Sequence, residues 1–544
     1  MKRFILFVCM LVAGIFIKQS FVSAQTVIYL DLNAIVNGDG LTPDNPTNQM
    51  PSQTIVSDTK LYFNSDNGVQ RIPSGRDNTF YITGSNIEIT SYGSGRATVS
   101  GYEIISGGWT QVGTSYVWKQ SFPGGSSGAG PIVGSVIDLS SINESPTGDV
   151  LNWYNLETEH DRIGTFQADP SVLPIGSYGY DWQNEMMYIN VGADPNSRSI
   201  GISQVGRLFN TTGNPSNVKI HGLRMIGFAR SVMNIGGGSN HWHIYDNELY
   251  GNGGMYNVKE GWYHGSGIQP NSNASHLEID HNTIIETFDS AITPQHFGGT
   301  SGHKLFNIYI HHNYVEKWSL GGVEIADWGT NEIDSITIED NTFVNGGKGY
   351  SGTGDTPQGK TDGIQTRGGN NGISRVSRLT VRRNNINSHD AAFIVGGNTI
   401  TDGVILEDNI LWGSTYGIKN QRKDEAYILA KDNVLCDNQI QISDQASASV
   451  YINNTLSTEC STTSSTINIE KPPRKVYPSI TEGVVNIESG SEKNAIVLID
   501  INGRKVGQWS NTSSIDISSK PSGFYMLIYK DPKNSISTFK IIKK

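Results

Sequence analysis

The amino-acid sequence predicts an all-β protein: a right-handed parallel β-helix (a solenoid) with a β-rich insertion, followed by a small C-terminal β-sandwich domain. Three observations support this fold class. Short strands that end in asparagine recur along the chain, and a second short strand recurs between them. The 544 residues include 62 glycines and only 36% hydrophobic residues, without long helical patterns. Self-similarity at a short period is typical of stacked architectures.

The first repeated unit is a strand with an apolar residue at every second position, closed by one asparagine. Its copies are 243–247, 277–282, 308–313, 336–341, 379–384, 404–409 and 428–433. The steps from Asn384 to Asn409 and from Asn409 to Asn433 are 25 and 24 residues, and earlier steps are longer. We expect each asparagine to adopt the left-handed conformation at a tight turn and to bond to the asparagine one coil away.

The second repeated strand has copies at 267–271, 291–295, 322–326, 363–367, 391–395 and 417–421. Alternation predicts that Ile268, Ile292, Val323, Ile364 and Ile418 point inward. One outward column is then Gln269, Thr293, Glu324, Gln365, Phe393 and Lys419. The next is Asn271, Gln295, Ala326, Arg367, Val395 and Gln421.

The start of the chain predicts export. Met1-Lys2-Arg3 is basic, residues 4–17 are almost wholly apolar, and Val22-Ser23-Ala24 has the small-x-small pattern of a signal-peptidase site. We therefore expect a signal peptide at 1–24, with an N-terminal membrane anchor as the alternative. The apolar run is too short to span a bilayer, so no membrane span is expected.

The mature chain divides by composition. Residues 25–105 are expected to form the N-terminal cap and first coils, 106–205 a β-rich insertion, and 206–460 the parallel β-helix with its groove. A Ser/Thr/Pro-rich linker at 461–473 precedes a domain at 474–544.

The last segment carries a series of short motifs: Val476-Tyr477-Pro478, 484–487, 496–500, Gly503-Arg504, 523–525 and 539–544. In order and spacing it resembles the C-terminal sorting domain of the type IX secretion system of Bacteroidetes. The resemblance implies the type IX secretion machinery as partner and a secreted or cell-surface location, reached through the periplasm. Without it, the segment reads as a small all-β domain such as a carbohydrate-binding module.

Charge and cysteine content narrow the partners. The formal net charge is −11 and no basic stripe is visible, which argues against nucleic acid. Cys436 and Cys460 are about one coil apart, so either a disulfide or two buried thiols is expected. We expect a monomer, no cofactor and no metal in the site, although scattered aspartates leave room for a structural calcium ion.

A candidate site lies where long insertions wall one face. Segments 251–264 and 345–361 both precede strands of the second set, so they should rise beside the Glu324 column. Glu324 and Asp327 are the expected catalytic carboxylates, with Asp327 in the groove only if the chain bends after its strand. His296 and Arg367, one coil to either side, would tune their protonation. The alternative is a surface ion-pair ladder.

Further residues are expected to contact substrate along this face: Gln269, Gln295, Gln365, His264, Tyr263, Trp328, Lys360 and Phe393. The other outward face carries Asp280, His311, Glu339, Arg382, Glu407 and Lys431, which predicts a solvated ladder of ion pairs. His281 and His312 are expected to belong to the turns.

The coil pattern and asparagine ladder over 206–460 resemble those of carbohydrate-active β-helix proteins, which include polygalacturonases, pectate, alginate and chondroitin lyases, and iota-carrageenases. The resemblance implies a polysaccharide substrate. We expect an endo-acting glycoside hydrolase, acting on a polymer that is acidic or sulfated like a carrageenan or fucan. One alternative is a polysaccharide lyase in which Arg367 neutralises a uronate and His296, Tyr263 or Lys360 is the base. The other is a non-catalytic surface adhesin.

Overall fold

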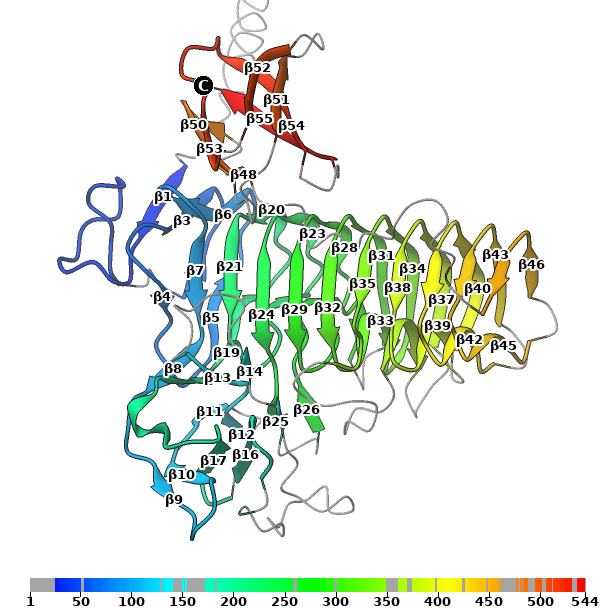
Figure 1. Cartoon of the computed structure of the whole chain (residues 1–544), viewed down its shortest axis with the longest axis horizontal. Coiled ribbons are helices and arrows are strands. Elements are labelled where there is room, and N and C mark those ends of the chain that lie inside the picture. Colours follow the sequence, from blue (N-terminus) through cyan, green and yellow to red (C-terminus); the bar gives the residue numbers. More distant parts are fainter. Residues whose placement is uncertain are drawn as a thin grey trace, which may run out of the picture.

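The computed structural model shows three long parallel sheets wound into a solenoid, with smaller β-units attached (Figure 1). Residues 1–24, the linker 461–473 and Lys360 lie outside the described residues. The structure describes residues 25–49, 53–127, 130–139, 149–150, 152–153, 171, 173–181, 183–257, 262–297, 301–348, 361–368, 374–396, 399–422, 426–446, 449–458, 460, 476–477, 480–481, 483–487, 495–500, 505–510, 512–530 and 536–543. Among these, no helix combines the length and apolarity that crossing a membrane requires.

Two of the three sheets run the length of the solenoid. The first sheet is ordered β1 (Thr26–Leu30), β3 (Thr59–Asn64), β6 (Ile87–Tyr92), β20 (Ser216–His221), β23 (Asn240–Tyr245), β28 (Ser275–Asp280), β31 (Ser301–His311), β34 (Thr330–Glu339), β37 (Ser374–Arg382), β40 (Thr399–Glu407), β43 (Ala426–Lys431) and β46 (Val450–Ile452). The second sheet is ordered β4 (Gln70–Arg71), β7 (Ala97–Ser100), β21 (Leu223–Ile226), β24 (Glu248–Asn252), β29 (Thr283–Thr287), β32 (Tyr314–Trp318), β35 (Thr342–Val344), β38 (Asn385–Asn387), β41 (Ile410–Trp412), β44 (Val434–Cys436) and β47 (Thr455–Ser457).

The third sheet comes in two parts that isolated bridges join, among them Ile268 to Ile292. One part is β2 (Thr54–Ile55), β5 (Arg76–Ile82), β19 (Val205–Thr211), β22 (Met233–Ile235) and β27 (Ile268–Pro270). The other is β30 (Gln295–His296), β33 (Gly321–Asp327), β36 (Asp362–Gly368), β39 (Ala391–Val395), β42 (Tyr416–Asn420) and β45 (Ile440–Asp444). The expected right-handed parallel β-helix is thus confirmed, and one continuous apolar core fills it.

Smaller β-units lie between β7 and β19 in the chain. One sheet is β14 (Asp149–Val150), β13 (Val136–Asp138), β18 (Ile200–Ser203) and β8 (Tyr102–Ile105); another is β15 (Asn152–Trp153), β16 (Ser177–Asp181), β17 (Met186–Asn190), β10 (Trp118–Ser121) and β9 (Thr110–Gln111). Strands β11 (Gly125–Ser127) and β12 (Gly130–Ile132) pair, and a 3-10 helix spans Pro195–Ser197. A hairpin of β25 (Met255–Asn257) and β26 (Trp262–His264) rises from the solenoid within the predicted 251–264 insertion.

The asparagine ladder is confirmed, with one correction. Asn341 donates its amide to Asn384 Oδ1 at 3.0 Å, and Asn384 donates in turn to Asn409 at 3.0 Å. The left-handed residue, however, directly precedes each asparagine: Arg383 before Asn384 has φ 54° and Asp408 before Asn409 has φ 55°. The residue before each asparagine therefore adopts the left-handed conformation of the turn, and the asparagine side chain lies inside the solenoid.

In strand β33 of the third sheet, two consecutive residues, Gly322 and Val323, point inward, and the chain turns a corner there. Val323 and Ile325 are buried in the core, yet a Cβ built on Gly322 would also meet core atoms, 2.7 Å from Phe343 Cδ1. A Cβ built on Gly321 instead points to the outward side, 2.7 Å from Gln365 Nε2. The corner thus brings Gly321 and Glu324 to the same outward side of the sheet.

The register of β39 corrects one predicted substrate contact. Phe393 pairs with Ile364 and Ile394 pairs with Gln365, one residue away from the predicted alignment. Phe393 is therefore fully buried in the core, and Ile394 continues the outward column of Glu324 and Gln365. The offset arises because Ala392, and not Ala391, is the counterpart of Gly363 at the start of the strand.

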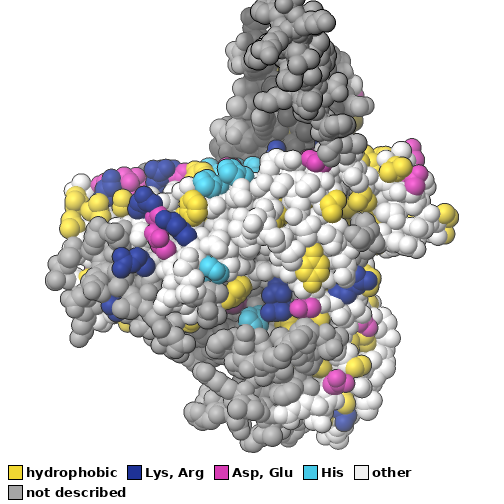
Figure 2. Space-filling view, turned by 180° about the vertical axis from the view of Figure 1, so that it is seen from behind, with side chains coloured by type: hydrophobic (Ala, Val, Ile, Leu, Met, Phe, Trp, Pro, Cys, Tyr) yellow, Lys and Arg dark blue, Asp and Glu magenta, His cyan; other side chains and the backbone are white. Residues whose placement is uncertain are grey.

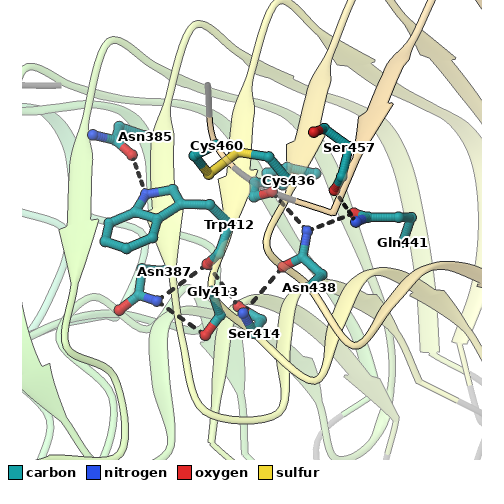
Figure 3. Close-up of a disulfide and its surroundings, with 11 residues drawn as sticks. Asn385, Asn387, Trp412, Gly413, Ser414, Cys436, Asn438, Gln441, Ser457 and Cys460 are labelled. Carbon is teal, nitrogen blue, oxygen red and sulfur yellow. Dashed lines mark hydrogen bonds between the residues drawn. A yellow bond between two sulfur atoms is a disulfide. The ribbon is translucent and has the colours of Figure 1, made fainter. Parts of the chain in front are cut away.

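A disulfide joins Cys436 of β44 to Cys460, with the two Cα atoms 4.9 Å apart (Figure 3). This bond settles the two alternatives left open by the sequence. Nearby, Asn438 donates to the Leu411 carbonyl and to Gln441, so side chains as well as the disulfide tie the last coils together.

The C-terminal segment forms a β-sandwich. One sheet is β48 (Val476–Tyr477), β50 (Val484–Ile487) and β53 (Ser514–Asp516); the other is β49 (Ile480–Thr481), β55 (Ile536–Lys543), β54 (Gly523–Lys530), β51 (Ala495–Asp500) and β52 (Lys505–Ser510). Apolar residues of both sheets share one core, including Val485 and Ile515 from the first and Leu498 and Leu527 from the second.

Candidate functional site

Glu324 lies at the centre of the third sheet's outward face. It pairs with Gln365 on β36 and is only 3% exposed. Ser290 Oγ donates a 3.0 Å hydrogen bond to Glu324 Oε2, and Arg367 Nη1 lies 3.4 Å from Oε1. Burial of a carboxylate is costly unless hydrogen bonds and an opposite charge compensate it, and both are present here. The predicted diagonal placement of Arg367 beside Glu324 is confirmed.

Asp289, which sequence reasoning missed, is the second carboxyl group beside Glu324. Burial and then the charge of Glu324 raise the pKa of Asp289 well above its usual range, against the opposing effect of Arg367. Its Oδ1 is buried without a hydrogen-bond partner, although the residue as a whole is partly accessible. The raised pKa favours the protonated form of Asp289, which is the form that can donate a proton. The two acids thus have different environments on adjacent coils.

Asp327 does not share the face of Glu324. It is fully buried, and its side chain holds the following turn. Oδ1 accepts hydrogen bonds from Gly329 N at 2.9 Å and Asn331 Nδ2 at 2.8 Å, and Oδ2 accepts one from Asn331 N at 2.9 Å. The expectation that Asp327 faces outward is therefore wrong. In a strand, side chains three positions apart lie on opposite faces, and the bend after Asp327 comes too late to reverse this.

His296 pairs with Asp327 rather than with an outward residue. It is fully buried, and its Nε2 lies 3.1 Å from the Glu332 carbonyl oxygen. Burial lowers the pKa of His296, which favours the neutral ring. The predicted alignment of His296 with Asp327 is thus confirmed, but the expectation that His296 faces the groove is wrong, because its side chain is buried.

Several predicted substrate contacts do border the groove. Trp328 is partly exposed, and the Arg367 guanidinium lies 5.6 Å from the centre of its ring. Trp328 Nε1 donates to Gln295 Oε1 at 3.3 Å, and Gln295 is itself partly exposed. Gln365 Nε2 is buried without a hydrogen-bond partner. A stacked Trp–Arg pair next to an unsatisfied amide donor suits a ligand with a flat face and hydroxyl groups.

The remaining predicted contacts are less informative. Gln269 lies in the part of the third sheet that precedes β30 and is 6% exposed, and His264 ends β26 and is partly exposed. Tyr263 lies in the backbone of β26, but its side chain is outside the described residues, as is the whole of Lys360.

The row of buried charges continues beyond Glu324. Asp362 pairs with Gly321 on the adjacent strand, and burial, with the charge of Asp390 next, raises the pKa of Asp362 to about 8. Asp390 is paired with Lys419, whose Nζ lies 3.0 Å from Asp390 Oδ2. Buried acids at Asp289, Glu324 and Asp362 thus follow the groove from coil to coil.

The sequence carried a signal for Asp289 and Asp362 that the strand alignment did not use. Both precede a Gly or Ala and an apolar residue at the start of a third-sheet strand: Asp289-Ser290-Ala291-Ile292 and Asp362-Gly363-Ile364. Simple alternation places such residues outside the strand or on the inward face. The corner with two consecutive inward residues explains Asp362, which pairs with Gly321 on the outward side. It does not explain Asp289, which lies one position earlier, where its carbonyl accepts a hydrogen bond from Leu320 N.

The opposite outward column is a ladder of charges, as expected. Asp280, His311, Glu339, Arg382, Glu407 and Lys431 are neighbours in strand register along the first sheet. Arg382 contacts Glu339, and Lys431 Nζ lies 2.6 Å from Glu407 Oε1. His281 and His312 have φ values of 52° and 53°, which places them in the turns.

Comparison with known proteins identifies the C-terminal domain. Residues 475–544 match the family described as secretion system C-terminal sorting domain. The predicted resemblance is confirmed, and the chain is a secreted, cell-surface protein. Among curated proteins none matches the chain.

Solved structures with related folds have low sequence identity. One described as a glycoside hydrolase is 10% identical with a TM-score of 0.45, and the match covers 79% of this chain and 96% of that chain. An exopolygalacturonase from Thermotoga maritima is 12% identical with a TM-score of 0.40, over 74% of this chain and 81% of that one. A surface adhesin of Streptococcus pneumoniae is 12% identical with a TM-score of 0.30, over 74% and 84%.

Proposed function

We propose that the chain is a secreted glycoside hydrolase that cleaves a polysaccharide within its length, with Asp289 as the general acid and Glu324 as the second carboxylate. Glycoside hydrolysis uses two carboxyl groups, one that protonates the leaving oxygen and one that acts as nucleophile or activates water. The observation that carries the proposal is the contrast between the two acids: Glu324 contacts Arg367 and Ser290, and burial together with the charge of Glu324 raises the pKa of Asp289.

The groove is suited to a polymer because outward positions repeat from β30 to β42 at the strand spacing of about 4.8 Å. Trp328 and Gln365 offer a stacking face and an amide donor beside the acids. Arg367 contacts Glu324 and has 32% of its side chain exposed, which favours an acidic or sulfated polymer. Internal cleavage is proposed because strands of the third sheet continue the outward face on both sides of Glu324.

For the lyase alternative, His296 is the candidate base whose side chain the structure describes, and its position argues against that role. His296 is fully buried, and its Nε2 faces a backbone carbonyl, so it is not positioned to remove a proton from a sugar in the groove. Product analysis separates the remaining possibilities, because a lyase forms an unsaturated sugar that absorbs ultraviolet light and a hydrolase forms only a new reducing end.

The test is a panel of neutral, uronic and sulfated polysaccharides treated with the mature protein, with both product signals recorded. We expect reducing ends without ultraviolet absorbance on at least one polymer, and loss of at least about 100-fold in rate for Glu324→Gln. Glu407→Gln, on the opposite face, serves as the matched control and should retain the rate. Ultraviolet-absorbing products would establish a lyase, and binding without either product would establish an adhesin.

A further inference from the structure

A cluster of histidines and acids lies on the first sheet, on the face opposite the groove. Where the outward column passes strands β23, β28 and β31, imidazoles replace the lysines and arginines that pair with acids farther along. Figure 2 shows histidine side chains gathered at the end of the row of alternating cationic and acidic side chains. The members of the cluster are His243, Glu278, Asp280, His281, His311 and His312.

Three strands bring these side chains together by register. His243 pairs with Glu278 on the neighbouring strand, and Asp280 pairs with His311 on the strand after that. His243 Nε2 lies 2.5 Å from Asp280 Oδ1 and 3.9 Å from Glu278 Oε2. His311 Nε2 lies 3.2 Å from Glu278 Oε1. The ligand atoms of His243, Glu278 and Asp280 all lie within 4.8 Å of one another.

We propose that His243, Glu278, Asp280 and His311 form a binding site for Zn²⁺. Zinc takes imidazole nitrogens and carboxylate oxygens at about 2.0–2.2 Å in a tetrahedron, so its ligand atoms are about 3.4 Å apart. The separations of 2.5 Å (His243–Asp280), 3.2 Å (His311–Glu278) and 3.9 Å (His243–Glu278) lie on both sides of that value. Two carboxylates balance the charge of the ion. Imidazole ligands favour zinc and similar transition ions over calcium or magnesium.

Neighbouring groups hold the ligands in place. Asp280 is the most buried member, with 9% of its side chain exposed, and its other oxygen lies 2.6 Å from His281 Nδ1. The His243 ring stacks on Tyr245 at 4.1 Å, and Tyr309 packs on His311 at 4.0 Å. These contacts restrict the rotation of the two imidazole rings. A plain ion-pair ladder would be served better by lysine or arginine, whose charge does not depend on pH near neutrality.

The sequence contained part of this signal. His241-Trp242-His243 is a His-x-His pair, which the expectation of no metal site passed over. In the structure only His243 joins the cluster, because His241 has a φ of 55° and stacks instead on His276 at 4.8 Å. The His-x-His spacing therefore indicated a metal site, but the proposed ligands come from three different coils.

The test is a titration of the untagged, metal-stripped mature protein with Zn²⁺ in competition with a chromophoric chelator. We expect one ion per chain with micromolar or tighter affinity, and a loss of at least about tenfold in His243→Gln, in His311→Gln and in Glu278→Gln. The control is His276→Gln, a histidine of the same face outside the cluster, which should bind like the unaltered protein. Substitution by Co²⁺ should give the visible absorption of a tetrahedral site.

Two outcomes overturn the proposal. One is the absence of stoichiometric zinc binding by the unaltered protein. The other is an equal small loss in all four variants, which would indicate diffuse binding by surface histidines. The site is independent of the groove, so the result stands whatever the polysaccharide assays show. Circular dichroism of each variant checks that the solenoid is folded.

Discussion

Arg367 Nη1 lies 3.4 Å from Glu324 Oε1, and the two residues come from neighbouring strands of the third sheet. The same guanidinium affects a third group, because its charge lowers the pKa of Asp289 while burial and Glu324 raise it. Arg367 therefore acts on both members of the acid pair. Its position suggests that it adjusts the pH range over which the groove works.

Arg367→Gln should move the alkaline limb of the pH–activity profile to higher pH. Activity requires the proton on Asp289, so it falls as pH rises through the pKa of that group. Removal of the nearby positive charge raises that pKa further, since the lowering contribution is lost. Rates of reducing-end release between pH 4 and 10 measure the shift. An alkaline limb that stays in place or moves to lower pH would mean that Asp289 does not set it.

Asp327→Asn should weaken the fold and spare the chemistry. Its two carboxylate oxygens accept three hydrogen bonds from Gly329 and Asn331. Asparagine has only one side-chain oxygen in place of these two. The free energy of unfolding should fall by about 1–3 kcal/mol in urea titration. Activity per folded molecule should remain within about twofold of the unaltered protein. Unchanged stability with abolished turnover would instead place Asp327 in the catalytic machinery.

Asp362→Asn should flatten the pH dependence of stability. Burial raises the pKa of Asp362 to about 8, so between about pH 4 and pH 8 the folded state keeps a proton that the unfolded state releases. Stability therefore decreases as pH rises through this range, by at most about 1.4 kcal/mol per pH unit. Asparagine does not titrate, and its Oδ1 can still accept from Ala391 N, as Asp362 does at 3.0 Å.

Urea unfolding at several pH values measures this slope. Asp66→Asn is the control: hydrogen bonds from Ser94 lower the pKa of Asp66, so its contribution changes below about pH 4 and the slope above that pH should persist. Equal slopes in Asp362→Asn and the unaltered protein would contradict the assignment of a proton to Asp362.

Asn341→Ala should destabilise the solenoid by about 2–5 kcal/mol. The Asn341 amide donates to Asn384 Oδ1, to the Ile310 carbonyl and to the Glu339 carbonyl, and all three bonds are 2.9–3.0 Å long. Alanine leaves buried partners unsatisfied, whereas loss of an exposed amide costs little. Asn33→Ala is the control, because its amide also donates two bonds but is exposed. Equal melting temperatures for the two variants would contradict a structural role of the ladder.

Alternation and repetition sufficed to predict the coils, the core and the charge ladder, because each strand buries every second side chain. They failed where the backbone departs from a strand. The corner before Val323 turns Gly321 and its register partner Asp362 outward. Ala392, and not Ala391, is the counterpart of Gly363 at this corner, which places Phe393 in the core. The bend after Asp327 turns a predicted catalytic acid into the acceptor for its own turn. Local backbone geometry of this kind is not visible in a hydrophobic pattern.

The pair of Asp289 and Glu324 is tested most directly by the rate of reducing-end release by Asp289→Asn on the best polymer of the panel. The exchange preserves shape and removes the transferable proton, so the rate should fall by at least about 100-fold while the melting temperature stays the same or rises. The expected gain in stability follows from the raised pKa of Asp289, because the buried acid is costly to keep at neutral pH. A rate within about threefold of the unaltered protein would contradict the assignment of Asp289 as the general acid.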